Sequence, residues 1–205
     1  MNVNEFFARP DDSSLLAPEQ RIILATLDSI AEFGLEGTTV RVIAAKAGLN
    51  PAAVNYYFRS KDRLVEEALR GAWTHVSEDI DRIIAARVGG RETMRTATAF
   101  LIEGAWRYPK LIRAIIVEHP VLRLEVATYL KEIFTRVARQ SGSTKDGELG
   151  SVLLIAFAVL LGFATDAVSL LTGLDLGEIE SRSRLSESLA ELLFGPVDDS
   201  AGPAS

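Results

Sequence analysis

The sequence has no cysteine and only two histidines, His75 and His119, among its 205 residues. The lack of cysteine excludes a disulfide scaffold, a cysteine-based zinc site, an iron–sulfur cluster and a thiol nucleophile. Two histidines are too few for a histidine-rich metal site or a histidine relay, and we expect both to be structural. We therefore expect neither a metal ion nor a cofactor.

The sequence also lacks the motifs of common enzymes. It contains no GxSxG, no HExxH, no phosphate-binding glycine loop and no dinucleotide fingerprint. Glu103 and Glu118 could pair as carboxylates in a helical enzyme, but their spacing does not require it. We expect no catalytic residue. A helical small-molecule-binding protein or enzyme that does not touch DNA is kept as the alternative hypothesis.

Sustained alternation of apolar and polar residues is missing as well, so the pattern predicts no sheet. The seven prolines mostly lie at plausible helix boundaries, and 48% of the residues are apolar, which excludes wholesale disorder. The sequence therefore predicts an all-α fold. The expected helices cover residues 18–34, 40–47, 51–57, 61–88, 92–106, 109–117, 120–139, 148–172 and 176–194.

A secretory signal is not evident, because the first twelve residues have no basic start followed by an apolar run. The expected location is cytoplasmic. The longest uncharged run, residues 149–165, is shorter than the roughly 20 apolar residues that span a bilayer. Asp166 follows it, and Lys, Arg, Trp and Tyr are absent from its ends. We interpret it as a buried helix, and expect no membrane partner.

Residues 38–61 have the features of a helix-turn-helix unit. Thr39 and Asn50 are suitable N-caps, Pro51 suits a first helical turn, and Gly48 suits a helix end. A tight glycine-containing turn sets two such helices at a steep angle. The second helix, at seven residues, would be about 10 Å long, which fits a DNA major groove about 12 Å wide.

Charge is distributed to match. Residues 37–63 contain five basic residues and one acidic residue, a net charge of +4. Because the whole chain has a net charge of −6, the residues outside this segment have a net charge of −10. Opposite signs in separate regions are typical of a protein that presents one face to DNA.

At this point the sequence resembles the TetR family of bacterial transcription regulators. The resemblance covers residues 18–70 and is carried by TVRxIAxxAG at 39–48 and NYYFxSK at 55–61. It implies a homodimer that binds a palindromic operator, most often as a repressor. It also implies a larger C-terminal helical domain, which holds the dimer interface and a small-molecule pocket. An apolar effector would release the DNA.

The resemblance assigns roles to individual residues. It places five at phosphates: Thr38, Thr39, Tyr56, Tyr57 and Lys61. It places four near base edges: Asn50, Ala52, Ala53 and Asn55. Arg41 is a further DNA-contact candidate, either solvated or at a phosphate. Many members have Tyr at the place of Asn55, His at the place of Tyr57 and an acidic residue at the place of Val42.

The expected domains are a flexible arm at 1–17, a three-helix DNA-binding domain at 18–64, a ligand-binding and dimerisation domain at 65–194, and a disordered tail at 195–205. Large or polar side chains that could line the effector pocket are Trp73, His75, Val76, Phe100, Trp106, Tyr108 and His119. Apolar residues expected at the dimer interface are Leu153, Phe157, Leu161, Ala164, Val168, Leu171, Ile179, Leu185, Leu189 and Leu192.

Overall fold

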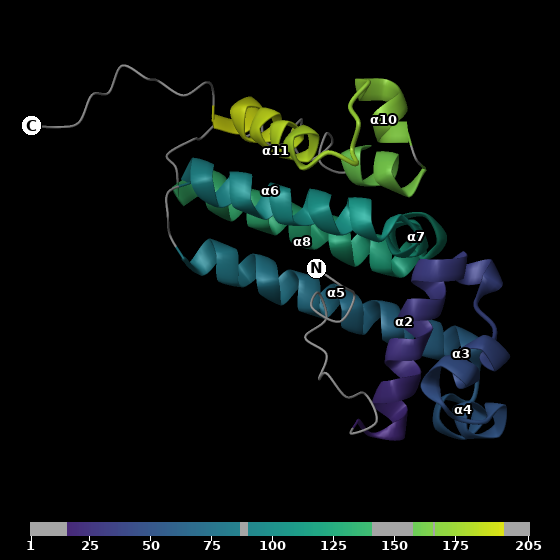
Figure 1. The fold of residues 1–205 in the computed structure, drawn as a ribbon. Helices are drawn as coiled ribbons and strands as arrows, with labels where there is room; N and C mark the ends of the chain where they lie inside the picture. Colours follow the sequence, from purple (N-terminus) through teal and green to yellow (C-terminus); the bar gives the residue numbers. More distant parts are fainter. Residues whose placement is uncertain (1–15, 87–89, 141–157, 166, 195–205) are drawn as a thin grey trace, which may run out of the picture. The chain divides into compact units, whose positions relative to one another are not determined.

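The computed structural model describes residues 16–86, 90–140, 158–165 and 167–194 (Figure 1). Within these ranges the chain forms helices joined by turns and contains no strand, which confirms the all-α prediction. The predictions for the arm and the tail fall outside the described residues, except for Leu16 and Ala17. No helix in the described ranges is long and apolar enough to span a membrane.

The chain divides into two compact units. The first contains Met1–Asp79 and Tyr108–Leu124, and the second contains Ile80–Arg107 and Glu125–Ser205. This division differs from the boundary expected between residues 64 and 65. The physical reason is that Pro109–Arg113, far along the chain, packs against the first helix.

The first unit is built from short helices around one apolar core. Its elements are α2 (Pro18–Gly37), α3 (Val40–Ala47), α4 (Pro51–Phe58), the start of α5 (Lys61–Ala85), α7 (Pro109–Arg113), the π-helical η2 (Ala114–Glu118) and the start of α8 (Pro120–Gln140). The side chains that form the core beneath α3 and α4 are Ile22, Ala25, Ile43, Ala44, Ala47, Val54, Phe58 and Leu64.

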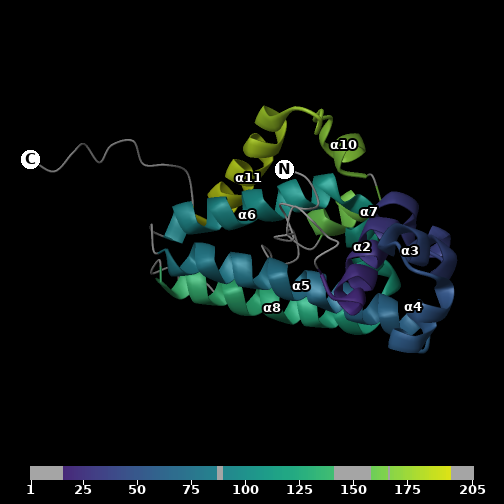
Figure 2. The same cartoon turned by 60° about the horizontal axis from the view of Figure 1, so that its bottom comes forward.

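The second unit contains the rest of α5 and α8, a helical stretch at 158–164, and three further helices: α6 (Gly90–Arg107), α10 (Ala167–Thr172) and α11 (Ile179–Phe194). α11 lies along α6 in both views (Figures 1 and 2). Asp81 of α5 accepts a hydrogen bond of 2.7 Å from Arg136 of α8. Burial first, and then the neighbouring Asp81 charge, raise the pKa of Tyr129 in this region.

The single helix expected at 148–172 is wrong in its second half. Thr165 forms a turn, and its N–H donates to the carbonyl of Gly162 at 3.3 Å before α10 begins. Val168 packs directly onto Gly162, where a Cβ atom would lie 2.8 Å from the Val168 Cγ2. The missing side chain of Gly162 therefore allows the chain to fold back. The first half of the expected helix lies outside the described residues.

Candidate nucleic-acid interface

The ends of α3 and α4 are capped as the sequence predicts. Thr39 Oγ1 accepts from Val42 N at 3.2 Å, and Asn50 Oδ1 accepts from Ala53 N at 2.8 Å. Thr39 caps α3 without the acidic partner that would complete a capping box. These contacts satisfy backbone N–H groups that a helix leaves without internal partners.

The turn between the two helices depends on Gly48. Its φ of 64° is left-handed, and its N–H donates to Ala45 O while Leu49 N–H donates to Ala44 O. This pair of bonds is a Schellman motif, which ends α3 and redirects the chain. A left-handed backbone favours glycine because it has no Cβ atom.

Arg21 of α2 holds this turn from the opposite side. Its guanidinium donates to the carbonyl of Ala47 and, at 3.4 Å, to that of Gly48. A positive charge at the carbonyl end of α3 is favourable. Sequence reasoning missed Arg21 because its partners lie 26 and 27 residues away and no local pattern marks them.

α4 has one buried side and one exposed side. Val54 and Phe58 are in the core. Asn55 and Tyr57 are exposed, and Tyr56 is 81% exposed. The two tyrosine rings meet edge to face, with centroids 5.3 Å apart. The apolar side fixes the helix, so the polar side is presented by a rigid support.

The ten proposed DNA contacts divide by exposure. Those exposed are Thr39, Arg41, Asn50, Ala52, Asn55, Tyr56 and Tyr57, while Ala53 and Lys61 are half-buried. Thr38 is completely buried, and its hydroxyl donates to Gly34 O at 2.6 Å. In this conformation Thr38 does not reach the surface, and it supports the end of α2 instead.

Lys61 serves the same end of α2. Its ammonium group donates to Leu35 O at 3.1 Å, just beyond Gly34, where a φ of 73° breaks the helical backbone. Lys61 is half-buried and therefore combines a structural contact with its proposed place at a phosphate.

Arg59 links α4 to α5 through a strained turn. Its φ of 57° and ψ of −33° make it the non-glycine residue with positive φ in the described ranges. Ser60 N–H donates to Phe58 O at 2.6 Å, which closes a γ-turn around Arg59. The turn places Ser60 to cap α5, where its Oγ accepts from Arg63 N at 3.2 Å.

The net positive charge at the surface of this region is smaller than the count of basic residues in 37–63 suggests. Lys46 forms an ion pair with Glu32 of α2 at 2.6 Å and lies 5.5 Å from the Phe33 ring centroid. Glu32 lies outside the segment 37–63 that carries the +4 balance. The exposed Arg41 and Arg59 are therefore the better candidates for phosphate contacts.

The proposed pocket residues fall in both units. Trp73 and Val76 are half-buried, His75 is exposed and Tyr108 is buried, all in the first unit. His119 is also there, and its Nδ1 accepts from Leu122 N at 3.4 Å, so it is a structural cap. Phe100 and Trp106 belong to the second unit, where both are half-buried.

The proposed interface residues are also divided. Leu171 and Ile179 are strongly exposed and Leu161 is 41% exposed, while Leu185 is half-buried. Leu170, which sequence reasoning missed, is 84% exposed. Three proposed residues are buried within the unit: Ala164, Val168 and Leu189. The positions of Leu153 and Phe157 and the side chain of Leu192 lie outside the described residues.

The carboxylates considered for catalysis each have arginine partners. Glu103 binds Arg107 and Arg182, and Glu118 binds Arg113 at 2.9 Å. Each pair lies within its own unit. Across the described ranges, no three His, Asp or Glu side chains gather as a metal site.

Comparison with known proteins shows which family the N-terminal residues match. Residues 22–68 match the family described as "Bacterial regulatory proteins, tetR family". Over 84 residues the chain is 38% identical to the HTH-type transcriptional regulator BetI of Burkholderia ambifaria, which covers 38% of this chain and 41% of that relative. The match therefore spans about two fifths of the relative's length.

Solved structures resemble a larger part of the chain than these sequence matches do. The fatty acid degradation regulator FadR from Bacillus halodurans has a TM-score of 0.67 at 18% identity, over 89% of this chain and 97% of that chain. The regulator FadR from Bacillus subtilis, in complex with stearoyl-CoA, has a TM-score of 0.64 at 18% identity, over 86% and 98%. At these identities the likeness shows the fold alone, and it confirms the predicted fold class.

Proposed function

We propose that this chain, whose residues 22–68 match the family of bacterial regulatory proteins described as tetR, regulates transcription by binding a palindromic operator as a homodimer. In this proposal it acts as a repressor in the cytoplasm, and a small apolar effector releases it from DNA. The match of residues 22–68 to this family favours the regulatory function over the enzyme alternative.

The exposed face of α4 carries the proposal. At eight residues the helix is about 12 Å long, which suits a major groove of about the same width. Asn55 offers an amide that can bond to a base edge, and the alanines can contact a thymine methyl group. Tyr56 and Tyr57 offer hydroxyl groups to the flanking phosphates. The Asn50 side chain caps the start of the helix, and at its end the N–H of Arg59 donates to Asn55 O at 3.0 Å.

The homodimer is supported by the exposed leucines of the second unit. Leu170 and Leu171 on α10 are 84% and 81% exposed, and Ile179 at the start of α11 is 66% exposed. Grouped apolar side chains of this size commonly mark an interface. A two-fold dimer covers the same surface on both copies and presents two reading helices to two half-sites.

The proposed effector is apolar or amphipathic. The stearoyl-CoA in the Bacillus subtilis structure is a ligand of that protein, and it suggests acyl compounds as the first to be tested here. Among the residues proposed for the pocket, Phe100 and Trp106 of the second unit are large, apolar and half-buried.

Binding-site selection from random duplex DNA tests the function. We expect the wild-type protein to enrich a palindrome, and Asn55→Ala to relax the preference at one position in each half-site by about 1–3 kcal/mol of discrimination. Asn2→Ala, in the proposed arm, is the control and should leave the enriched sequence unchanged. Failure of the wild-type protein to enrich any sequence would refute the proposal.

Phosphate contact by Lys61 is tested by the salt dependence of operator binding. Lys61→Ala should weaken binding to all sequences and lower the salt slope by about 1. Because Lys61 also donates a hydrogen bond to Leu35 O, the unfolding curve of the Lys61→Ala variant must be measured together with its operator affinity. A loss of stability with an unchanged salt slope would assign Lys61 a structural role only.

A further inference from the structure

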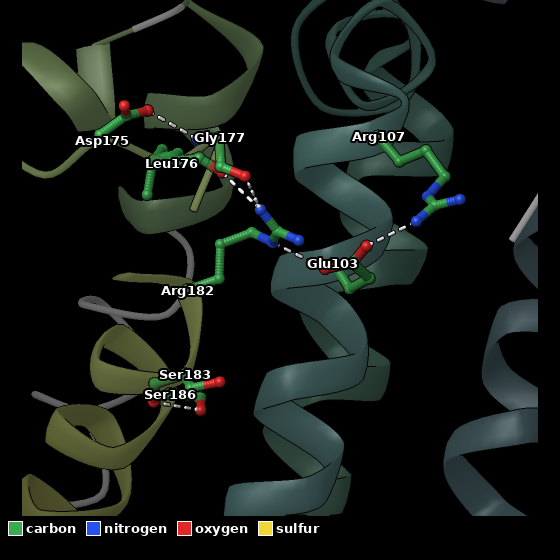
Figure 3. A network of polar contacts seen from close by, with 8 residues as sticks. All are labelled: Glu103, Arg107, Asp175, Leu176, Gly177, Arg182, Ser183 and Ser186. Atoms are coloured by element: carbon green, nitrogen blue, oxygen red, sulfur yellow. Dashed lines mark hydrogen bonds and ion pairs between the residues drawn. The ribbon is translucent and has the colours of Figure 1, made fainter. Parts of the chain in front are cut away.

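A polar network joins α6 to α11 within the second unit. Glu103 of α6 lies between two arginines, with Arg182 of α11 on one side and Arg107 of α6 on the other (Figure 3). Burial acts to raise the pKa of Glu103, but hydrogen bonds and charges from Arg107 and Arg182 outweigh it and lower that pKa. Glu103 is therefore ionised at neutral pH, and the three side chains carry a net charge of +1.

Arg182 makes three hydrogen bonds inside this network. Its Nε donates to Glu103 Oε2 at 2.7 Å, and its Nη1 donates to Leu176 O at 2.6 Å and Gly177 O at 3.1 Å. The guanidinium carbon lies 4.1 Å from the Trp106 ring centroid, and the residue is 8% exposed. Arg182 thus ties α11 and the preceding turn to α6.

Arg107 is used only in part. Its Nη2 donates to Glu103 Oε1 at 2.7 Å, whereas its Nε is buried and has no acceptor among the described residues. The side chain is 25% exposed, so part of the guanidinium can be reached. A buried N–H without an acceptor is unfavourable, and an arginine offers five donors in a planar fork that fits a carboxylate or phosphate.

We infer that Arg107 binds the anionic head group of the effector, whose apolar chain runs along α6. The positive charge that a ligand can reach is that of Arg107, because Arg182 is 8% exposed and lies against the Trp106 ring, whereas the Arg107 side chain is 25% exposed. Phe100 precedes Arg107 by two helical turns and so lies on the same face of α6. A ligand that contacts both Arg107 and Phe100 must have an anionic group and an apolar chain. An acyl chain that ends in a carboxylate or phosphate has both. This inference rests on the proposed function and specifies the effector of that regulator.

Titration calorimetry with three probes of equal chain length tests the inference on the full chain. The probes are laurate, dodecyl phosphate and dodecanol, each below its aggregation concentration. We expect the wild-type protein to bind one or both anions at least about 10-fold more tightly than dodecanol, as one charge-assisted hydrogen-bonded contact provides. The comparison of laurate with dodecyl phosphate identifies the head group.

Arg107→Gln should lose this preference and bind dodecanol as the wild type does, while Arg107→Lys should keep only part of it. Arg95→Gln is the matched control, since Arg95 lies on the same helix and bonds to Glu92 at 2.6 and 2.8 Å. It should retain the full preference. An unchanged preference in both Arg107 variants, or no preference in the wild type, would overturn the inference.

Operator binding without effector separates the two proposals. We expect Arg107→Gln to bind the selected operator as tightly as the wild type, because Arg107 lies in the second unit. If the wild type selects an operator but shows no anion preference, the effector inference fails and the regulatory function stands. If it shows the anion preference but selects no operator, the proposed function fails.

Discussion

The two units place polar and apolar side chains in opposite ways. In the first unit Phe58 and Val54 are buried under α4, while Asn55 and Tyr56 face outward. In the second unit a charged residue, Arg182, is 8% exposed, while Leu170 is 84% exposed. The first unit therefore presents a polar surface on an apolar support, as DNA recognition requires. The second encloses charge and presents apolar surface, as association with another apolar surface requires.

The contrast predicts different consequences of mutation. In the first unit, function is carried by exposed polar groups and stability by apolar packing. In the second unit, buried charges contribute to stability and exposed leucines contribute to assembly. The following changes test these assignments, in order of decreasing effect.

Leu170→Glu combined with Leu171→Glu should abolish the dimer. Burying a leucine contributes about 1.5–3 kcal/mol, and a two-fold dimer loses four such side chains and gains four charges. Light scattering should report monomers, and operator binding should fall steeply because two half-sites are no longer gripped together. Val168, also expected at the interface, is buried beside Gly162, so a charge there would destabilise the unit itself and would not test the dimer.

Val121→Glu combined with Leu124→Glu is the matched control. Both residues are exposed, at 58% and 68%, but they lie in the first unit. This variant should remain dimeric. If this variant is monomeric and the Leu170 and Leu171 variant is dimeric, the interface lies at the start of α8 and not at α10.

Phe58→Ala should lower the free energy of unfolding by about 3–5 kcal/mol, as removal of a buried aromatic side chain does. Phe58 is 3% exposed and packs in the core beneath α3 and α4. Chemical denaturation at one fixed protein concentration measures the change. Phe33→Ala, which removes a ring that is 45% exposed, should cost less than about 1 kcal/mol. Similar losses for the two variants would contradict an apolar support for α4.

The sequence was more informative about the first unit than about the second, and the reason is the range of the interactions. Thr39, Gly48 and Asn50 act on backbone groups within a few residues, so their spacing predicts the caps and the turn. Arg182 acts on Glu103, 79 residues away. No local pattern marks such a partner.

Side-chain exposure was the other weak point. Thr38 and Thr39 are equivalent by composition, but Thr38 bonds inward to Gly34 and Thr39 lies outside. Val168 and Leu171 were both expected at the dimer interface, yet only Leu171 is exposed. Helical periodicity identifies an apolar stripe but not whether its partner is the same chain or a second copy.

Glu103→Gln should lower the stability at pH 7 by about 1–2 kcal/mol, a modest value because the carboxylate is 32% exposed and screened by solvent. The folded pKa of Glu103 lies below its usual 4.5, so the ionised form stabilises the folded state. This contribution is complete above the unfolded pKa and is lost as the pH falls through the folded pKa.

The difference between Glu103→Gln and the wild type should therefore shrink on acidification below pH 4.5. Urea unfolding at pH 7 and at successively lower pH measures it. Glu118→Gln is a suitable comparison, since Glu118 pairs with the half-exposed Arg113 in the first unit. It should change stability by less than about 1 kcal/mol. A Glu103 effect independent of pH would show that the lost charge is not its cause.

Arg59→Gly should produce the smallest change, a gain in stability of up to about 1 kcal/mol. Arg59 has a φ of 57°, which strains a residue with a Cβ atom and leaves glycine unstrained. Arg41→Gly provides a control of opposite sign, because glycine inside the regular helix α3 should cost about 1 kcal/mol. Both variants remove one exposed arginine from the proposed DNA surface, so equal losses of operator affinity would reflect charge alone. Thermal unfolding separates the backbone effects of the two substitutions. If both variants lose the same stability, the γ-turn at Arg59 is not strained.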